Sequence, residues 1–120
     1  MIFRDDTHER LYHEFLNRLS WVECYQRAVC YLMALDTELR KHPEDVFNFE
    51  DGSGGSINPD GLTKGWQTGT SARTTRLLYN LWNGYTEEEH AREYTPESLF
   101  YSEYADFYYE AVKIRFERVR

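Results

Sequence analysis

Hydrophobic residues recur at intervals of three and four along the first part of the chain. Between residues 7 and 19 the apolar positions are Leu11, Tyr12, Phe15, Leu16 and Leu19. This spacing is typical of a helix that buries one face. Asp6 and Glu9 stand near its start at the spacing of a capping box, so we predict a helix over about residues 7–19.

The next stretch is apolar over a wider arc. A second capping signature, Ser20 to Glu23, opens it, and His42-Pro43 closes it. The apolar positions are Trp21, Tyr25, Ala28, Leu32, Leu35 and Leu39, with Val22, Val29 and Met33 alongside. A stripe this wide is typical of a helix that has neighbours on several sides. We therefore predict that this helix forms the centre of a bundle.

Turn and cap residues divide the rest of the chain. Pro43 begins a short helical turn, and residues 50–62, rich in glycine, serine and acids, predict a surface loop with a brief hairpin near residues 58–61. A helix over residues 71–82 should end at Asn83-Gly84. Thr95-Pro96 signals the start of a last helix or pair of helices. The cations expected in its final turns are Lys113, Arg115, Arg118 and Arg120.

These patterns together predict an all-α fold. We expect a compact bundle of about five helices with one long surface loop, forming a single domain over residues 1–120. No convincing strand is predicted. The composition fits a packed core, because hydrophobic residues make up 41% of the chain and aromatic residues 17%, too many for a disordered chain.

The cellular compartment is predicted from two features, which are the lack of a membrane span or signal peptide in the sequence and the positions of its two cysteines. No stretch approaches the ~20 apolar residues of a membrane span, and the first residues do not form a signal peptide. Cys24 and Cys30 fall on one predicted helix, ~9 Å apart along its axis at the rise of an α-helix, which is beyond disulfide reach. We therefore expect a soluble cytoplasmic protein with reduced thiols.

The net charge of −7 is unevenly distributed. Residues 36–60 carry seven acids and two bases, and residues 87–110 carry eight acids and one base. Between them, residues 61–86 carry three bases and no acid. This distribution argues against general nucleic-acid binding, which needs a broad basic surface. It leaves a small basic island on an acidic protein.

That island contains the first candidate site, for an anion. Small and hydroxyl residues at a predicted helix N-terminus precede two arginines that lie three apart; the residues are Thr68, Gly69, Thr70, Ser71, Arg73 and Arg76. Free backbone N–H groups and the helix dipole attract anions at such a place. The alternative is architectural: Thr70 or Ser71 caps the helix, and both arginines pair with the flanking acids.

The second candidate site is an acidic, aromatic surface on the last helices, for a protein partner. Its residues are Tyr101, Glu103, Tyr109 and Glu110. Exposed tyrosines supply rigid contact area, and neighbouring acids would select a basic partner. In the alternative interpretation Tyr104 and Tyr108 belong to the core, and the other tyrosines only cover the surface.

No residue pattern points to catalysis or to a metal. His8-Glu9 and His13 resemble a zinc-binding helix only superficially, since the two histidines are five residues apart and lie on different faces. Neither cysteine has an evident histidine or aspartate partner. We expect no cofactor, no metal and no catalytic site, and we favour a protein that is not an enzyme.

Several segments resemble a small family of bacterial proteins whose function is unknown. The resemblance rests on residues 64–71, 75–85, 94–100, 102–105 and 110–115 and extends over nearly the whole chain. Such proteins are expected mainly in Gram-positive gut bacteria and on mobile elements, and they bring no catalytic residues. We predict a small acidic protein-interaction module, in the role of an inhibitor or accessory protein of a mobile element; a homo-oligomer is compatible with it. The alternative is a domain that recognises an anion or a nucleotide.

Overall fold

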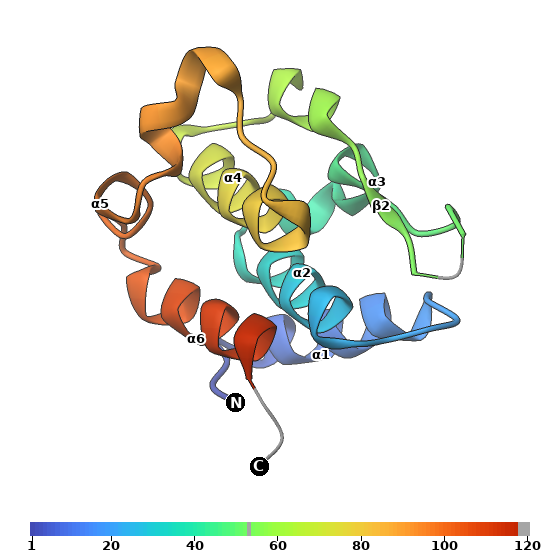
Figure 1. Cartoon of the computed structure of the whole chain (residues 1–120). Helices are drawn as coiled ribbons and strands as arrows, with labels where there is room; N and C mark the ends of the chain where they lie inside the picture. Colours follow the sequence, from blue (N-terminus) through green and yellow to red (C-terminus); the bar gives the residue numbers. More distant parts are fainter. Residues whose placement is uncertain (53, 118–120) are drawn as a thin grey trace.

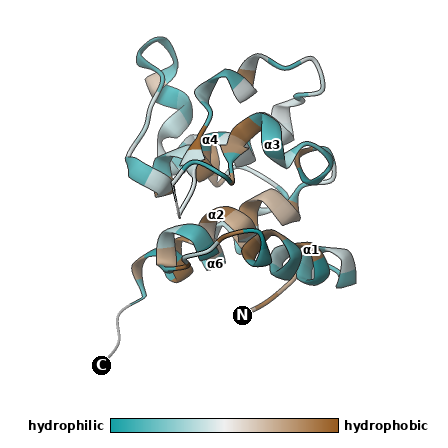
Figure 2. Cartoon of the chain, turned by 90° about the vertical axis from the view of Figure 1, so that its right-hand side faces the viewer, coloured by the Kyte–Doolittle hydropathy of each residue, from teal (hydrophilic) through white to brown (hydrophobic). Residues whose placement is uncertain are grey.

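The helix α2 (Cys24–Leu35) lies at the centre of the fold (Figure 1). In the computed structural model, which describes residues 1–52 and 54–117, α2 packs against α1 (Asp6–Asn17), α4 (Gly69–Asn83) and α6 (Ala105–Phe116). Every residue from Ala28 to Leu35 is completely buried, and Figure 2 shows that much of the α2 ribbon has the brown colour of hydrophobic residues. This confirms the predicted central helix.

Shorter elements connect the four main helices. They are η1 (Leu39–Lys41), α3 (Pro43–Val46), β1 (Phe47–Asn48), β2 (Ser56–Ile57), η2 (Pro59–Thr63), η3 (Glu88–Tyr94) and α5 (Pro96–Leu99). The two strands form a minimal antiparallel pair, and every other regular element in the described residues is helical. The predicted all-α class is therefore confirmed. None of the helices in the described ranges combines the length and the hydrophobicity needed to cross a membrane.

The first two helices begin later or are capped differently than predicted. Asp5, not Asp6, caps α1, because its carboxylate accepts the backbone N–H of His8 at 2.6 Å. α2 starts only at Cys24, where Glu23 and Gln26 form the capping box. Trp21 therefore precedes the helix and is exposed, as is Tyr25 in its first turn. The prediction that these two rings begin the apolar stripe of the central helix was wrong.

A short β-pair replaces part of the predicted loop. Phe47 pairs with Ile57 and Asn48 with Ser56. The prediction that the chain has no strand was therefore wrong for these four residues. The predicted hairpin near residues 58–61 is also wrong, since Asn58 caps η2 and residues 59–61 belong to it. Gly55 has a left-handed φ of +82° and lies against the Phe47 ring, where a Cβ atom would clash.

The later helices follow their local signals closely. α4 begins at Gly69, two residues earlier than predicted, and ends before Gly84, whose φ of +79° confirms the predicted stop. Thr95 caps α5 by accepting the N–H of Ser98. The last turn of α6 contains Lys113 and Arg115, as predicted. Arg118 and Arg120 lie outside the described residues.

Candidate functional site

The beginning of α4 is held by a reciprocal cap. Thr68 Oγ1 accepts the N–H of Ser71 at 3.1 Å, and Ser71 Oγ accepts the N–H of Thr68 at 2.7 Å. Gln67 accepts the Ser71 hydroxyl proton at 2.6 Å. Ser71 is completely buried. Thr68 is thus the capping residue, where the architectural interpretation had placed Thr70 or Ser71. Both Thr68 Oγ1 and Ser71 Oγ already have hydrogen-bond partners within the chain.

This cap yields a stability prediction. Thr68→Ala removes the acceptor for the Ser71 N–H and should lower the free energy of unfolding by about 1 kcal/mol, the usual cost of losing a threonine cap. Urea denaturation monitored by circular dichroism measures it. Thr86→Ala, at an exposed position before η3, is the matched control and should change little. An equal loss in the two variants would mean that the cap does not stabilise α4.

Two backbone N–H groups at this helix start remain available. The amides of Gly69 and Thr70 occupy the first two helical positions, before intrahelical bonding begins. Neither has an acceptor among the described residues. The partial positive charge of the helix N-terminus is therefore concentrated at these two groups.

The two arginines of the segment have different roles. Arg76 forms ion pairs with Glu87 at 2.9 Å and with Glu93 at 3.1 Å. Burial acts to raise the pKa of Glu87, but hydrogen bonds from Arg76 and Tyr94 outweigh it and lower that pKa below its ordinary value. Arg76 thus ties the acidic segment of η3 to α4. Arg73 forms no ion pair or hydrogen bond with any described residue.

Arg73 lies between two adjoining surface hollows. One, of ≈ 480 Å³, is lined by Gly69, Arg73, Arg76, Glu93, Glu97, Ser98 and Tyr101. The other, of ≈ 510 Å³, is lined by Thr70, Arg73, Phe100, Tyr101, Ser102 and Glu103. Arg73 and Tyr101 are common to both, so we call the pair of hollows the α4–α5 groove. Tyr101 is 83% exposed.

The groove joins residues that the sequence had assigned to separate sites. Gly69, Thr70 and Arg73 come from the predicted anion site, whereas Tyr101 and Glu103 come from the predicted partner surface. Glu93, Glu97, Ser98, Phe100 and Ser102 complete the lining and were not predicted. They come next to α4 because η3, α5 and the turn that follows α5 pack against it, and no spacing along the chain signals this.

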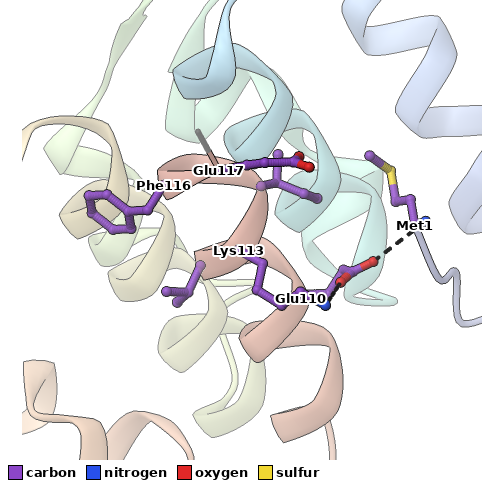
Figure 3. A pocket seen from close by; sticks show the side chains of 7 residues that line it. Met1, Glu110, Lys113, Phe116 and Glu117 are labelled. Atoms are coloured by element: carbon purple, nitrogen blue, oxygen red, sulfur yellow. Dashed lines mark ion pairs between the residues drawn. The ribbon is translucent and has the colours of Figure 1, made fainter. Parts of the chain in front are cut away.

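The other two predicted partner residues lie elsewhere, on α6. Tyr109 is 65% exposed on the outer side of this helix. Glu110 is largely buried, and its carboxylate accepts the backbone N–H of Ile2 at 2.9 Å and pairs with Lys113 at 3.3 Å. Figure 3 shows Glu110 between Lys113 and the amine of Met1. Burial acts to raise the pKa of Glu110, but the Ile2 N–H and Lys113 lower it overall. The Glu110 carboxylate is therefore occupied within the chain.

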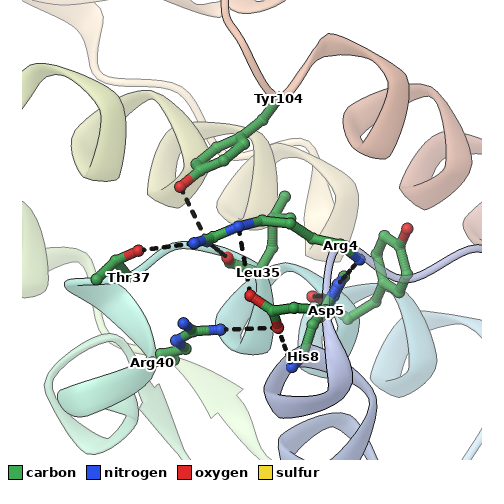
Figure 4. A network of polar contacts seen from close by, with 8 residues as sticks. Arg4, Asp5, His8, Leu35, Thr37, Arg40 and Tyr104 are labelled. Carbon is green, nitrogen blue, oxygen red and sulfur yellow. Dashed lines mark hydrogen bonds and ion pairs between the residues drawn. The ribbon is translucent and has the colours of Figure 1, made fainter.

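A polar cluster at the N-terminal segment was also missed by the sequence (Figure 4). Arg4 donates to the Leu35 carbonyl at 2.6 Å and to the Tyr104 hydroxyl at 3.0 Å. Asp5, besides capping α1, pairs with Arg40 at 3.3 Å. Burial acts to raise the pKa of Asp5, but the His8 N–H and the two arginines lower it overall.

His8 is the buried member of this cluster. Its Nδ1 accepts the backbone N–H of Arg4 at 3.0 Å, so its Nε2 carries the proton and donates to the Tyr31 carbonyl at 2.9 Å. The side chain has no exposed surface, and burial lowers the pKa of His8 to about 4. Because the ring nitrogens of His8 and the charged groups of Arg4 and Asp5 have partners within the cluster, we assign it an architectural role: it fixes the first residues onto α2.

The described residues contain no group of three histidine, cysteine or acidic side chains that could hold a metal ion. A family model described as a family of unknown function (DUF6075) matches residues 1–120. Searches of curated proteins and of solved structures found no match. The predicted resemblance to a family of unknown function is thereby confirmed, while its bacterial, gut and mobile-element context stays a prediction.

Proposed function

The chain belongs to this family of unknown function, and from its geometry we propose that it is a non-catalytic protein-binding module whose contact surface is the α4–α5 groove. One observation carries the proposal. Arg73, a cation without an ion pair among the described residues, lines both hollows together with Tyr101, whose ring is largely exposed. Arginine and tyrosine are the residues that most often dominate binding at protein interfaces.

The charges of the groove indicate what the partner offers. The Arg73 guanidinium can bind a carboxylate. The free backbone N–H groups of Gly69 and Thr70, which carry partial positive charge, add further hydrogen-bond donors. The rim is acidic, with Glu97 and Glu103 on either side of Tyr101 in sequence. A partner segment with one acidic side chain flanked by basic ones complements both the Arg73 guanidinium and the acidic rim.

A phosphate or nucleotide fits the same groove less well. The second cation of the segment, Arg76, is already neutralised by Glu87 and Glu93. The remaining acids of the rim would repel a ligand with two or more negative charges. A single carboxylate of a protein partner is therefore favoured over a phosphorylated ligand. The predicted role as inhibitor or accessory protein of a mobile element would use this surface.

The test compares charge reversals of two arginines. The native chain, Arg73→Glu and Arg92→Glu are immobilised and exposed to lysate of the cells that produce the protein, and bound proteins are quantified by mass spectrometry. Arg92 is exposed on η3, does not line the groove and has no ion pair among the described side chains, so it is the matched control. A partner should be retained by the native chain and by Arg92→Glu, and reduced about tenfold or more by Arg73→Glu.

Tyr101→Ala should reduce the same partner to a similar extent. Equal retention by all variants would reject the groove as the contact surface. Thermal shift with inorganic phosphate and with ATP distinguishes the alternative: stabilisation that Arg73→Glu abolishes, without a retained partner, would favour an anion-binding domain.

A further inference from the structure

The outer side of α6 carries a second apolar stripe that the described chain covers only in part. The core side of this helix buries Tyr104, Tyr108, Ala111 and Ile114. Farther around the helix, at intervals of four, three and four, lie Ala105, Tyr109, Val112 and Phe116. Tyr109 and Phe116 are exposed, and Ala105 and Val112 are half-buried. These intervals are those of a helix seam that packs against another helix. A helix needed only for its own core would present polar residues there.

Two aromatic side chains of this stripe are exposed. In the described part of the chain seven large hydrophobic side chains are exposed, and two of them, Tyr109 and Phe116, belong to the stripe. Met1 lies at Glu110, on the other side of α6 from Phe116 (Figure 3).

A hollow of ≈ 840 Å³ opens on the same face. Val112 and Phe116 of the stripe line it, and Met1, Lys113 and Glu117 stand around it (Figure 3). The stripe and the hollow thus form one continuous surface, which we call the α6 face. It shares no lining residue with the α4–α5 groove.

We propose that the α6 face binds the α6 face of a second copy of this chain, with the two α6 helices antiparallel. The charges beside the stripe fit this occupant. Asp106 and Lys113 are both exposed and are seven residues apart, so they lie on the same flank of the stripe. In an antiparallel pair the flank of one helix faces the same flank of the other helix, with the residues running in the opposite direction. Asp106 then lies opposite Lys113 of the second copy, and the contact occurs twice because the pair is symmetric.

A parallel pair would not use these charges. It would set the flank of Asp106 and Lys113 against the other flank, which contains Tyr108 and Arg115. Tyr108 is completely buried and exchanges a hydrogen bond with Thr74 at 2.5 Å. Arg115 donates to the Leu81 carbonyl at 2.7 Å and lies over the Tyr25 ring. Both side chains are therefore held within the chain. The Lys113 side chain also pairs with Glu110 but is 65% exposed, so it can still reach a second copy, and this favours the antiparallel arrangement.

The size of the face sets the strength of the pair. α6 has 12 residues, about 18 Å at the rise of an α-helix. An interface of this size lies at the small end for proteins, so association should be reversible and fall in the micromolar range. Sedimentation velocity from about 5 µM to about 500 µM, in about 0.15 M salt so that the net charges are screened, should show the weight-average mass rising toward twice that of one chain.

Two tyrosines test the face. Tyr109→Glu places a charge in the stripe and should weaken the dimer about tenfold or more, because a charge in the centre of an interface is desolvated without a partner. Tyr101→Glu, at an even more exposed tyrosine off the stripe, should leave the dimer unchanged. Tyr101 variants should lose the partner of the groove while keeping the dimer. The proposed groove and the proposed α6 dimer can therefore be rejected independently of each other.

Two charge reversals test the direction. Asp106→Lys and Lys113→Asp should each weaken self-association, since each brings like charges together at both ends. An equimolar mixture of the two variants should regain the dimer, because lysine then faces aspartate at both ends. Circular dichroism checks that each variant is folded. A native chain that is monomeric at about 500 µM, a Tyr109→Glu variant that still dimerises, or a mixture that does not recover would each overturn the proposal.

Discussion

Acidification from about pH 7.5 to about pH 5 should lower the free energy of unfolding by about 2 kcal/mol, and His8 should be the main cause. The ring is completely buried, and its Nδ1 must stay unprotonated to accept the Arg4 N–H. Burial lowers the pKa of His8 from 6.5 to about 4, reinforced by the nearby Arg4 and Arg40 and opposed by Asp5 and by the bond to Tyr31.

The sign follows from proton binding. Between about pH 6.5 and about pH 4 the unfolded chain binds a proton at His8 and the folded chain does not, so lowering the pH favours unfolding. The carboxylates of Asp5, Glu87 and Glu110, whose pKa values are lowered in the folded state, add their own loss only at more acidic pH. The range from about pH 5 to about pH 7.5 therefore isolates the histidine.

Chemical denaturation at a series of pH values measures this effect. His8→Gln should remove most of the pH dependence in this range, at the cost of lower stability at neutral pH. His13→Gln is the matched control, since His13 is an exposed histidine on the same helix. If His8→Gln does not fold, NMR titration of the native chain gives the answer. A His8 ring that titrates near pH 6.5, or a pH dependence unchanged by the substitution, would contradict the assignment.

Gly61→Ala should destabilise the fold by about 3 kcal/mol, because an added methyl group has no space at this position. A Cβ atom there would lie 2.5 Å from the Asp45 carbonyl oxygen, 2.7 Å from the Tyr79 hydroxyl and 2.7 Å from the Val46 side chain. The first is backbone and the second is fixed by its hydrogen bond to the Asn58 carbonyl, so neither can move aside cheaply.

The same substitution should disturb the candidate site. The Gly61 carbonyl accepts Gln67 Nε2 at 3.2 Å, and Gln67 in turn holds Ser71 at the start of α4. Gly65→Ala is the control in the same segment, because a Cβ atom there meets nothing within 4 Å. Thermal and urea denaturation should show a large loss for Gly61→Ala and almost none for Gly65→Ala. Similar stability of the two variants would mean that η2 can shift without cost.

Local signals were sufficient where a cap or a proline decides the element. Pro43, Thr95-Pro96 and Gly84 mark helix boundaries that the structure confirms. Proline fixes its own φ, the threonine side chain caps the first turn, and glycine adopts the left-handed φ that ends a helix. They failed where two cap candidates competed. Ser20 and Glu23 have the spacing of a capping box, but the capping box forms between Glu23 and Gln26 instead. α2 therefore starts later in the chain than predicted, and Trp21 lies outside it.

The candidate site was predictable in parts and not as a whole. The chain order shows a helix start at residues 68–71 and a row of tyrosines and acids after residue 100. It does not show that Tyr101 and Arg73 line the same groove, because this depends on how α5 packs against α4. The burial of His8 was equally hidden, since the residues that cover it come from other elements, such as Tyr31 on α2.

The sequence by itself determined the all-α class, the central helix and the two regions that carry the candidate residues. These follow from periodicity and capping, which depend on neighbours along the chain. Only the tertiary structure decided the roles of the two arginines. Arg73 and Arg76 are three residues apart on one helix, yet Arg76 is neutralised by Glu87 and Glu93 of η3 while Arg73 faces the groove. Charge pairing depends on distance in space, and here the distances are set by the packing of η3 and α5 against α4.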